Sequence, residues 1–114
     1  MIFELITLQT QRHASIYDYS VRISILGDDA CEVDIYEMKN GIRYDVLYYK
    51  LQADELHGTA EITFHLINGT AKKKAFSIDF SDEIFQVIGL IRGILERVHA
   101  YRKENQKSVD DSGK

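Results

Sequence analysis

Apolar and polar residues alternate along much of the chain between residues 16 and 80, and this two-residue period predicts half-buried β-strands. The clearest runs cover residues 16–26, 31–36 and 59–67, each with one apolar and one polar face. Residues 1–10 form a less regular apolar stretch, which we interpret as a further strand with contacts on both faces. Short turns separate the runs, so the pattern predicts an antiparallel β-meander of five or six strands.

The dipeptide Asn40-Gly41 predicts a tight hairpin. Asn-Gly is well suited to a type I′ turn, in which both central residues have a positive φ angle. A two-residue loop at this point pairs Ile35 with Val46, so the apolar faces of the two flanking segments coincide. We therefore predict a strand over residues 42–51, although its second half could also form a helical turn.

A second Asn-Gly dipeptide, at residues 68 and 69, predicts a wider loop. A two-residue turn there would place Phe76 on the wrong face of the hairpin, because a shift by one residue moves every side chain to the other face. A three-residue loop over residues 68–70 pairs Ile62 with Phe76 and restores the match.

The segment from Ser81 onward is the one clear helix. Ser81 is a favourable N-cap, Asp82 suits the positive end of the helix dipole, and apolar residues then recur with a period of about 3.6. A helix on the apolar face of the sheet gives an α+β fold, with one domain over residues 1–104 and a flexible tail over residues 105–114. The predicted core comprises Tyr19, Val21, Ile23, Val33, Ile35, Val46, Ile62, Phe64, Phe76, Ile78, Ile88, Ile91 and Leu95.

Composition narrows the class of protein. The chain has 114 residues, a net charge of −4, no proline and a single cysteine, so an internal disulfide is excluded. No apolar run approaches the roughly 18 residues that a membrane span needs, and the first residues do not resemble a secretory signal. We therefore expect a cytoplasmic protein without membrane association.

Candidate catalytic groups are weak, and we expect a protein that is not an enzyme and needs no cofactor or metal. Cys31 lies in an apolar alternation, where a thiol acts as a small hydrophobic side chain. Glu32 and Asp34 share one strand face at a spacing compatible with acid/base chemistry, but a solvated strand face explains them as well. The four histidines form no metal-ligand spacing.

The leading functional hypothesis is a non-enzymatic protein-interaction or regulatory domain. The outer face of the central hairpin is expected to carry more apolar area than a solvated face needs, and so to bind a partner protein. This predicted partner surface comprises Tyr36, Met38, Arg43, Leu47, Tyr49 and Leu51.

Homodimerisation is the second part of that hypothesis. Two glycines inside a helix are unfavourable by about 1 kcal/mol each relative to alanine, and here they fall opposite the core-facing stripe, where a second helix could approach closely. The predicted dimer interface comprises Phe85, Gly89, Gly93, Arg97 and Ala100. The competing interpretation is that these glycines are simply tolerated.

Two alternatives stay open. The run Lys72-Lys73-Lys74 with His65 across the hairpin could form a basic patch for single-stranded nucleic acid, although the net negative charge opposes phosphate binding. A small ligand could instead bind between sheet and helix, in a pocket lined by Tyr17, Tyr44 and Tyr48.

Overall fold

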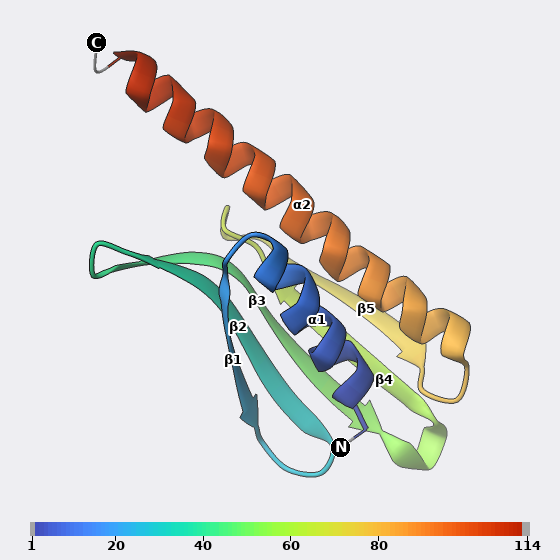
Figure 1. The fold of residues 1–114 in the computed structure, drawn as a ribbon. Coiled ribbons are helices and arrows are strands. Elements are labelled where there is room, and N and C mark those ends of the chain that lie inside the picture. The colour runs from blue at the N-terminus through green and yellow to red at the C-terminus, as the bar shows by residue number, and fades with distance from the viewer. Residues whose placement is uncertain (1, 113–114) are drawn as a thin grey trace.

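The computed structural model describes the backbone of residues 2–112 and the side chains of residues 2–105. Five strands form one antiparallel sheet in the order β1-β2-β3-β4-β5, and two α-helices lie side by side on one of its faces (Figure 1). This α+β architecture confirms the predicted meander with a C-terminal helix. The elements in chain order are α1 (Glu4–Ile16), β1 (Ser20–Ile25), β2 (Ala30–Lys39), β3 (Ile42–Asp54), the short 3₁₀ helix η1 (Glu55–His57), β4 (Thr59–His65), β5 (Ala71–Ser77) and α2 (Ser81–Ser112).

The first segment of the chain is a helix, so the strand predicted over residues 1–10 is wrong. Two threonines conceal the helical period, because Thr7 and Thr10 occupy buried positions that a hydropathy pattern scores as polar. Each hydroxyl donates a hydrogen bond to a backbone carbonyl of α1, Thr7 to Glu4 at 3.0 Å and Thr10 to Ile6 at 2.8 Å. The buried stripe follows helical spacing and comprises Phe3, Ile6, Thr7, Thr10 and Ala14.

The predicted register of the β2–β3 hairpin is wrong beyond Tyr36, because the hairpin contains a β-bulge. Near the tight turn the pairing is as predicted, with Lys39 opposite Ile42 and Tyr36 opposite Asp45. The register then shifts, and Ile35 pairs with Leu47 instead of Val46. The one extra residue reverses which side chains face inward along the rest of β3, while residues 42–51 are a strand as predicted.

The β4–β5 hairpin has the wider loop that the sequence predicts, but the loop begins one residue earlier. The Leu66 N–H donates to the Thr70 carbonyl at 2.9 Å, which leaves residues 67–69 as the loop. Ile62 consequently pairs with Lys74 rather than with Phe76. The shift is two residues, so the faces are unchanged and Ile62 and Phe76 are both buried.

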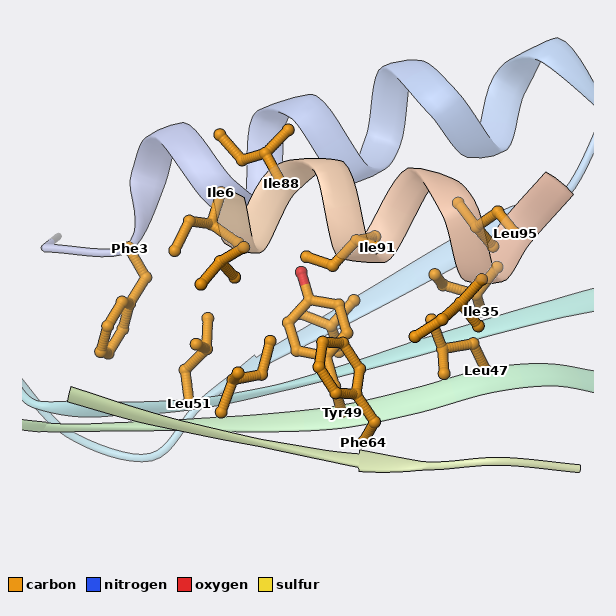
Figure 2. Packing of buried hydrophobic residues seen from close by; sticks show 14 of the residues in the cluster. Phe3, Ile6, Ile35, Leu47, Tyr49, Leu51, Phe64, Ile88, Ile91 and Leu95 are labelled. Carbon is orange, nitrogen blue, oxygen red and sulfur yellow. The ribbon is translucent and has the colours of Figure 1, made fainter. Parts of the chain in front are cut away.

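The core fills the space between the sheet and the two helices (Figure 2). Ten of the thirteen predicted core residues are buried, and Val21, Ile23 and Ile78 are partly buried against them. Sequence reasoning missed a second group of fully or nearly fully buried side chains: Phe3, Ile6, Leu47, Tyr49 and Leu51.

The C-terminal helix is longer than the predicted domain boundary implies. The backbone of α2 is helical through Ser112, eight residues past the boundary drawn after residue 104. At 1.5 Å per residue, its 32 residues span about 48 Å, and its last turns run beyond the sheet (Figure 1). Side chains beyond residue 105 lie outside the described part of the chain, and the flexibility of the tail over residues 105–114 stays a prediction.

Candidate functional site

The outer face of the sheet does not carry the predicted partner surface. Leu47, Tyr49 and Leu51 are only 2%, 0% and 0% exposed, because the bulge turns them toward the helices, and their placement on the outer face is wrong. Of the predicted set, Tyr36, Met38 and Arg43 do remain outside the core. The only sign in the sequence is the unbroken run Val46-Leu47-Tyr48-Tyr49, which interrupts the alternation but does not indicate which of the later side chains face inward.

Polar contacts occupy part of what remains of the outer face, where Met38 is 54% exposed. The Arg43 guanidinium lies 4.3 Å from the centre of the Tyr36 ring and forms ion pairs with Asp34 and Asp45, which raise the pKa of Arg43. Both carboxylates are therefore already partnered within the protein. An aromatic ring covered by an arginine offers little bare apolar area to a partner.

Tyr48 is the most perturbed group on this outer face. Burial and a hydrogen bond with Glu32 raise its pKa to about 12, so its phenol is neutral at physiological pH. Tyr48 lines two hollows: one, shared with Glu32, has a volume of about 230 Å³, below the usual range for small-molecule sites, and the other, shared with His65, has a volume of about 520 Å³. Tyr48 also lies across the sheet from the helices, so the three tyrosines predicted to line one pocket are not brought together.

The three consecutive lysines do not form one basic patch. In β5, Lys72 and Lys74 pair with Phe64 and Ile62 and point to the helix-covered face, whereas Lys73 points to the outer face. Lys73 is paired with Glu61 at 3.8 Å on that face. Since β5 is an edge strand, lysines at these positions also protect the sheet from edge-to-edge association.

A polar cluster joins α2 to the β2–β3 hairpin beside a cavity of about 530 Å³. The Tyr19 hydroxyl is 2.8 Å from His99 Nδ1, and Arg102 donates to the Glu37 carboxylate at 2.7 Å. The Arg102 guanidinium also lies 5.2 Å and 5.8 Å from the ring centres of Tyr19 and Tyr44.

The electrostatics of this cluster favour a structural role. Burial raises the pKa of Tyr19. Partial burial would lower the pKa of Arg102, but its hydrogen bonds with Glu37 and Tyr19 raise it overall. Every buried side-chain nitrogen and oxygen in the described residues has a hydrogen-bond partner, so this cluster presents no unmet buried group to a ligand. It acts as a clamp that holds the C-terminal half of α2 over the sheet.

Cys31 is a core residue in the structure. It is fully buried, and burial raises the pKa of its thiol to about 11, so the thiolate that nucleophilic chemistry needs is suppressed at neutral pH. Within the described part of the chain, no three His, Cys, Asp or Glu side chains come close enough together to hold a metal ion. The described helices are too polar or too short to cross a bilayer.

The predicted dimer residues do lie on one exposed face of α2. Phe85 is 57% exposed, and Arg97 and Ala100 are exposed on the same helix. A Cβ atom added to Gly89 or Gly93 would meet no other atom within 4 Å, so neither glycine serves a close contact inside the protomer. The core-facing stripe of α2 is formed instead by the buried residues Val87, Ile88, Ile91, Ile94, Leu95 and Val98.

A groove that sequence reasoning missed runs between α2 and the β4–β5 hairpin. Its volume is about 540 Å³. The only sequence signals were an apolar pair directly before the second Asn-Gly dipeptide and a tyrosine outside the buried stripe of α2. Residues that line it include Leu66, Ile67, Lys72, Ile94, Arg97 and Tyr101.

Comparison with known proteins adds no functional information. No protein-family model matches this chain, and neither the curated proteins nor the solved structures give a significant match. Any functional conclusion therefore depends on the surfaces described above.

Proposed function

We propose that this chain is a non-enzymatic protein-interaction module that works as a homodimer, joined through the exposed face of α2. The observation that carries the proposal is the pair Gly89 and Gly93, which lie inside the N-terminal half of a long helix without any close contact inside the protomer. Each glycine is unfavourable by about 1 kcal/mol relative to alanine. A helix of a second chain that packs closely against this face would explain why these positions are glycine rather than alanine.

The apolar residues beside the glycines support the same face. Phe85 is 57% exposed and Leu90 is 39% exposed, so large apolar side chains lie in solvent on the flanks of the glycine positions. Aromatic residues that are exposed around a flat, close-approach surface are typical of protein interfaces. Contact with solvent alone stabilises neither the two glycines nor the exposed apolar side chains beside them.

The charge distribution favours a second copy of the same chain as the occupant. A two-fold axis pairs residue i of one chain with residue j of the other and j with i. An antiparallel contact centred between Gly89 and Gly93 therefore places Gly89 of one chain against Gly93 of the second chain, and Gly93 against Gly89. This arrangement brings the acidic first turn, with Asp82 and Glu83, toward the basic stretch around Arg97 and Lys103 of the second chain. The opposed helix dipoles also favour it.

The decisive experiment measures mass in solution. Sedimentation equilibrium of the wild type at micromolar concentration is expected to give a dimer. Gly93→Leu is expected to give a monomer, because the leucine fills the proposed contact, whereas its Cβ meets nothing within 4 Å inside the protomer. Leu56→Ser is the matched control, since Leu56 is 90% exposed and lies away from α2 in η1. A monomeric wild type would refute the proposal.

Phe85→Ser provides a second, independent variant. It removes an exposed aromatic side chain without changing a glycine, and it is expected to weaken association at least roughly tenfold, about 1.4 kcal/mol. If Gly93→Leu and Phe85→Ser both left a dimer intact, then the dimer would have to form through another surface.

A further inference from the structure

The groove between α2 and the β4–β5 hairpin has an apolar floor that is open to solvent. Its floor is formed by Ile94 and Val98 of α2, which are 8% and 9% exposed, and by Leu66, which directly follows β4. Ile67 and Tyr101 are far more exposed, at 47% and 55%. The groove, at about 540 Å³, is within the size range of ligand-binding clefts.

The charged residues of this groove are all basic. Lys72 and Arg97 line it, no acidic residue does, and neither cation forms an ion pair with another described residue. Lys74 points to the same face of β5 as Lys72. This concentration of positive charge beside apolar side chains stands out in a chain whose net charge is −4.

We propose that this groove binds an acidic amphipathic segment of a partner protein. An apolar side chain of the segment contacts Ile67, Ile94 and Tyr101, while its carboxylates meet Lys72 and Arg97. A peptide suits the site because the groove includes Lys72 of β5, the last strand of the sheet, whose outer backbone edge has no partner strand and can pair with an extended segment. Nucleic acid suits it less, since Lys73 of the same strand points to the opposite face.

The proposal does not depend on the α2 dimer. Arg97 borders both surfaces, but the glycines of the proposed dimer contact do not line the groove, and the groove lining comes partly from the β4–β5 hairpin. Lys72 and Ile67 line the groove but lie outside the proposed dimer contact, so substitutions there test the groove alone, and Phe85→Ser, which is not in the groove lining, tests the dimer alone.

The electrostatic half of the proposal is tested with adjacent lysines. The probe is a fluorescein-labelled amphipathic peptide of about 12 residues that combines Glu and Leu, and binding to the full chain is followed by fluorescence anisotropy. Lys72→Gln is expected to reduce the affinity about threefold to fivefold, and added salt is expected to weaken binding. Lys73→Gln changes the net charge equally on the same strand but on the opposite face, and it is expected to have no effect. Equal losses in both variants would overturn the proposal, because they would indicate only general attraction to a basic edge.

The apolar half is tested with a matched pair of exposed residues. Ile67→Ser, in the hairpin loop, is expected to reduce peptide affinity roughly fivefold, whereas Leu56→Ser is expected to have no effect. A control peptide with Lys in place of every Glu is expected not to bind. Equal binding of both peptides, or no binding of the acidic peptide at low salt, would refute the proposed groove. Displacement of the peptide by a single-stranded oligonucleotide of equal charge would refute it in favour of phosphate recognition.

Discussion

Replacing the two α2 glycines by alanine separates the stability of the protomer from its association. An added Cβ at Gly89 or Gly93 meets nothing within 4 Å, and both residues lie in the interior of a helix. The gain expected from helix propensity alone is about 1 kcal/mol per substitution. For a domain of this size, each substitution then raises the melting temperature by roughly 4–6 °C.

The dimer contact has the opposite requirement. A methyl group placed between two closely packed backbones overfills the contact, and overpacking typically costs about 1–3 kcal/mol. The same alanine is therefore expected to stabilise the protomer and to lower the association constant roughly tenfold. A single methyl group would raise the stability of the protomer and lower the association constant only if this face of α2 is open in the protomer and covered in the dimer.

Two measurements test this pair of signs. Urea unfolding of Gly93→Ala in the Phe85→Ser background, where the chain is expected to be monomeric, reports the protomer alone. Sedimentation equilibrium of Gly93→Ala without the second substitution reports association. Gly58→Ala is the contrasting control: Gly58 has a φ of +65° and an added Cβ would clash with the Asp79 carboxylate, so alanine there is expected to destabilise the protomer by about 1–2 kcal/mol.

Either of two results would refute the reasoning. A loss of stability in the monomeric background would mean that the glycine face is not open within the protomer. A gain in stability with unchanged association would mean that the glycines lie outside any interface, and the proposed dimer would lose its main support.

Three further predictions follow from buried or clamped groups. Thr10 Oγ1 donates to the Ile6 carbonyl and lies 2.7 Å from the Tyr49 hydroxyl, so the Tyr49 hydroxyl must be the donor in the bond between the two side chains. Thr10→Val leaves that hydroxyl buried without an acceptor, and it is expected to lower the free energy of unfolding by about 1–3 kcal/mol in urea titrations. Tyr49→Phe removes the donor instead, and it is expected to lower the free energy of unfolding by only about 1 kcal/mol. Burial raises the pKa of the Cys31 thiol from 9.0 to about 11, so its stabilising contribution is complete below pH 9 and is lost as the pH rises to about 11. Between these two pH values the wild type is expected to lose more unfolding free energy than Cys31→Ala. An equal loss in both proteins would contradict the burial argument. Glu37→Gln weakens the clamp and is expected to speed amide hydrogen exchange around Arg102 more than in the core, measured by mass spectrometry. Unchanged exchange around Arg102 would show that the clamp does not hold the helix.

The sequence was sufficient to predict the parts of the fold that depend on local patterns. Alternation located the strands of the meander, the Asn40-Gly41 turn was found where a type I′ hairpin needs it, and the 3.6-residue period located α2. The exposed glycine face of α2 followed from the same period, because the buried stripe of a helix also determines which residues lie opposite it. These features depend on neighbours along the chain.

The tertiary structure alone decided which side of β3 faces the core. The bulge between the two halves of the β2–β3 hairpin is stabilised by the helices above the sheet, where Tyr49 finds both a packed environment and the hydroxyl of Thr10. Thr10 in turn belongs to a helix whose buried stripe is partly polar, and its hydropathy pattern therefore suggested a strand. In both cases a residue's environment depends on partners distant in sequence: in β3 a one-residue register shift reverses the exposure of the following side chains, and in α1 two threonines are buried although a hydropathy pattern scores them as polar.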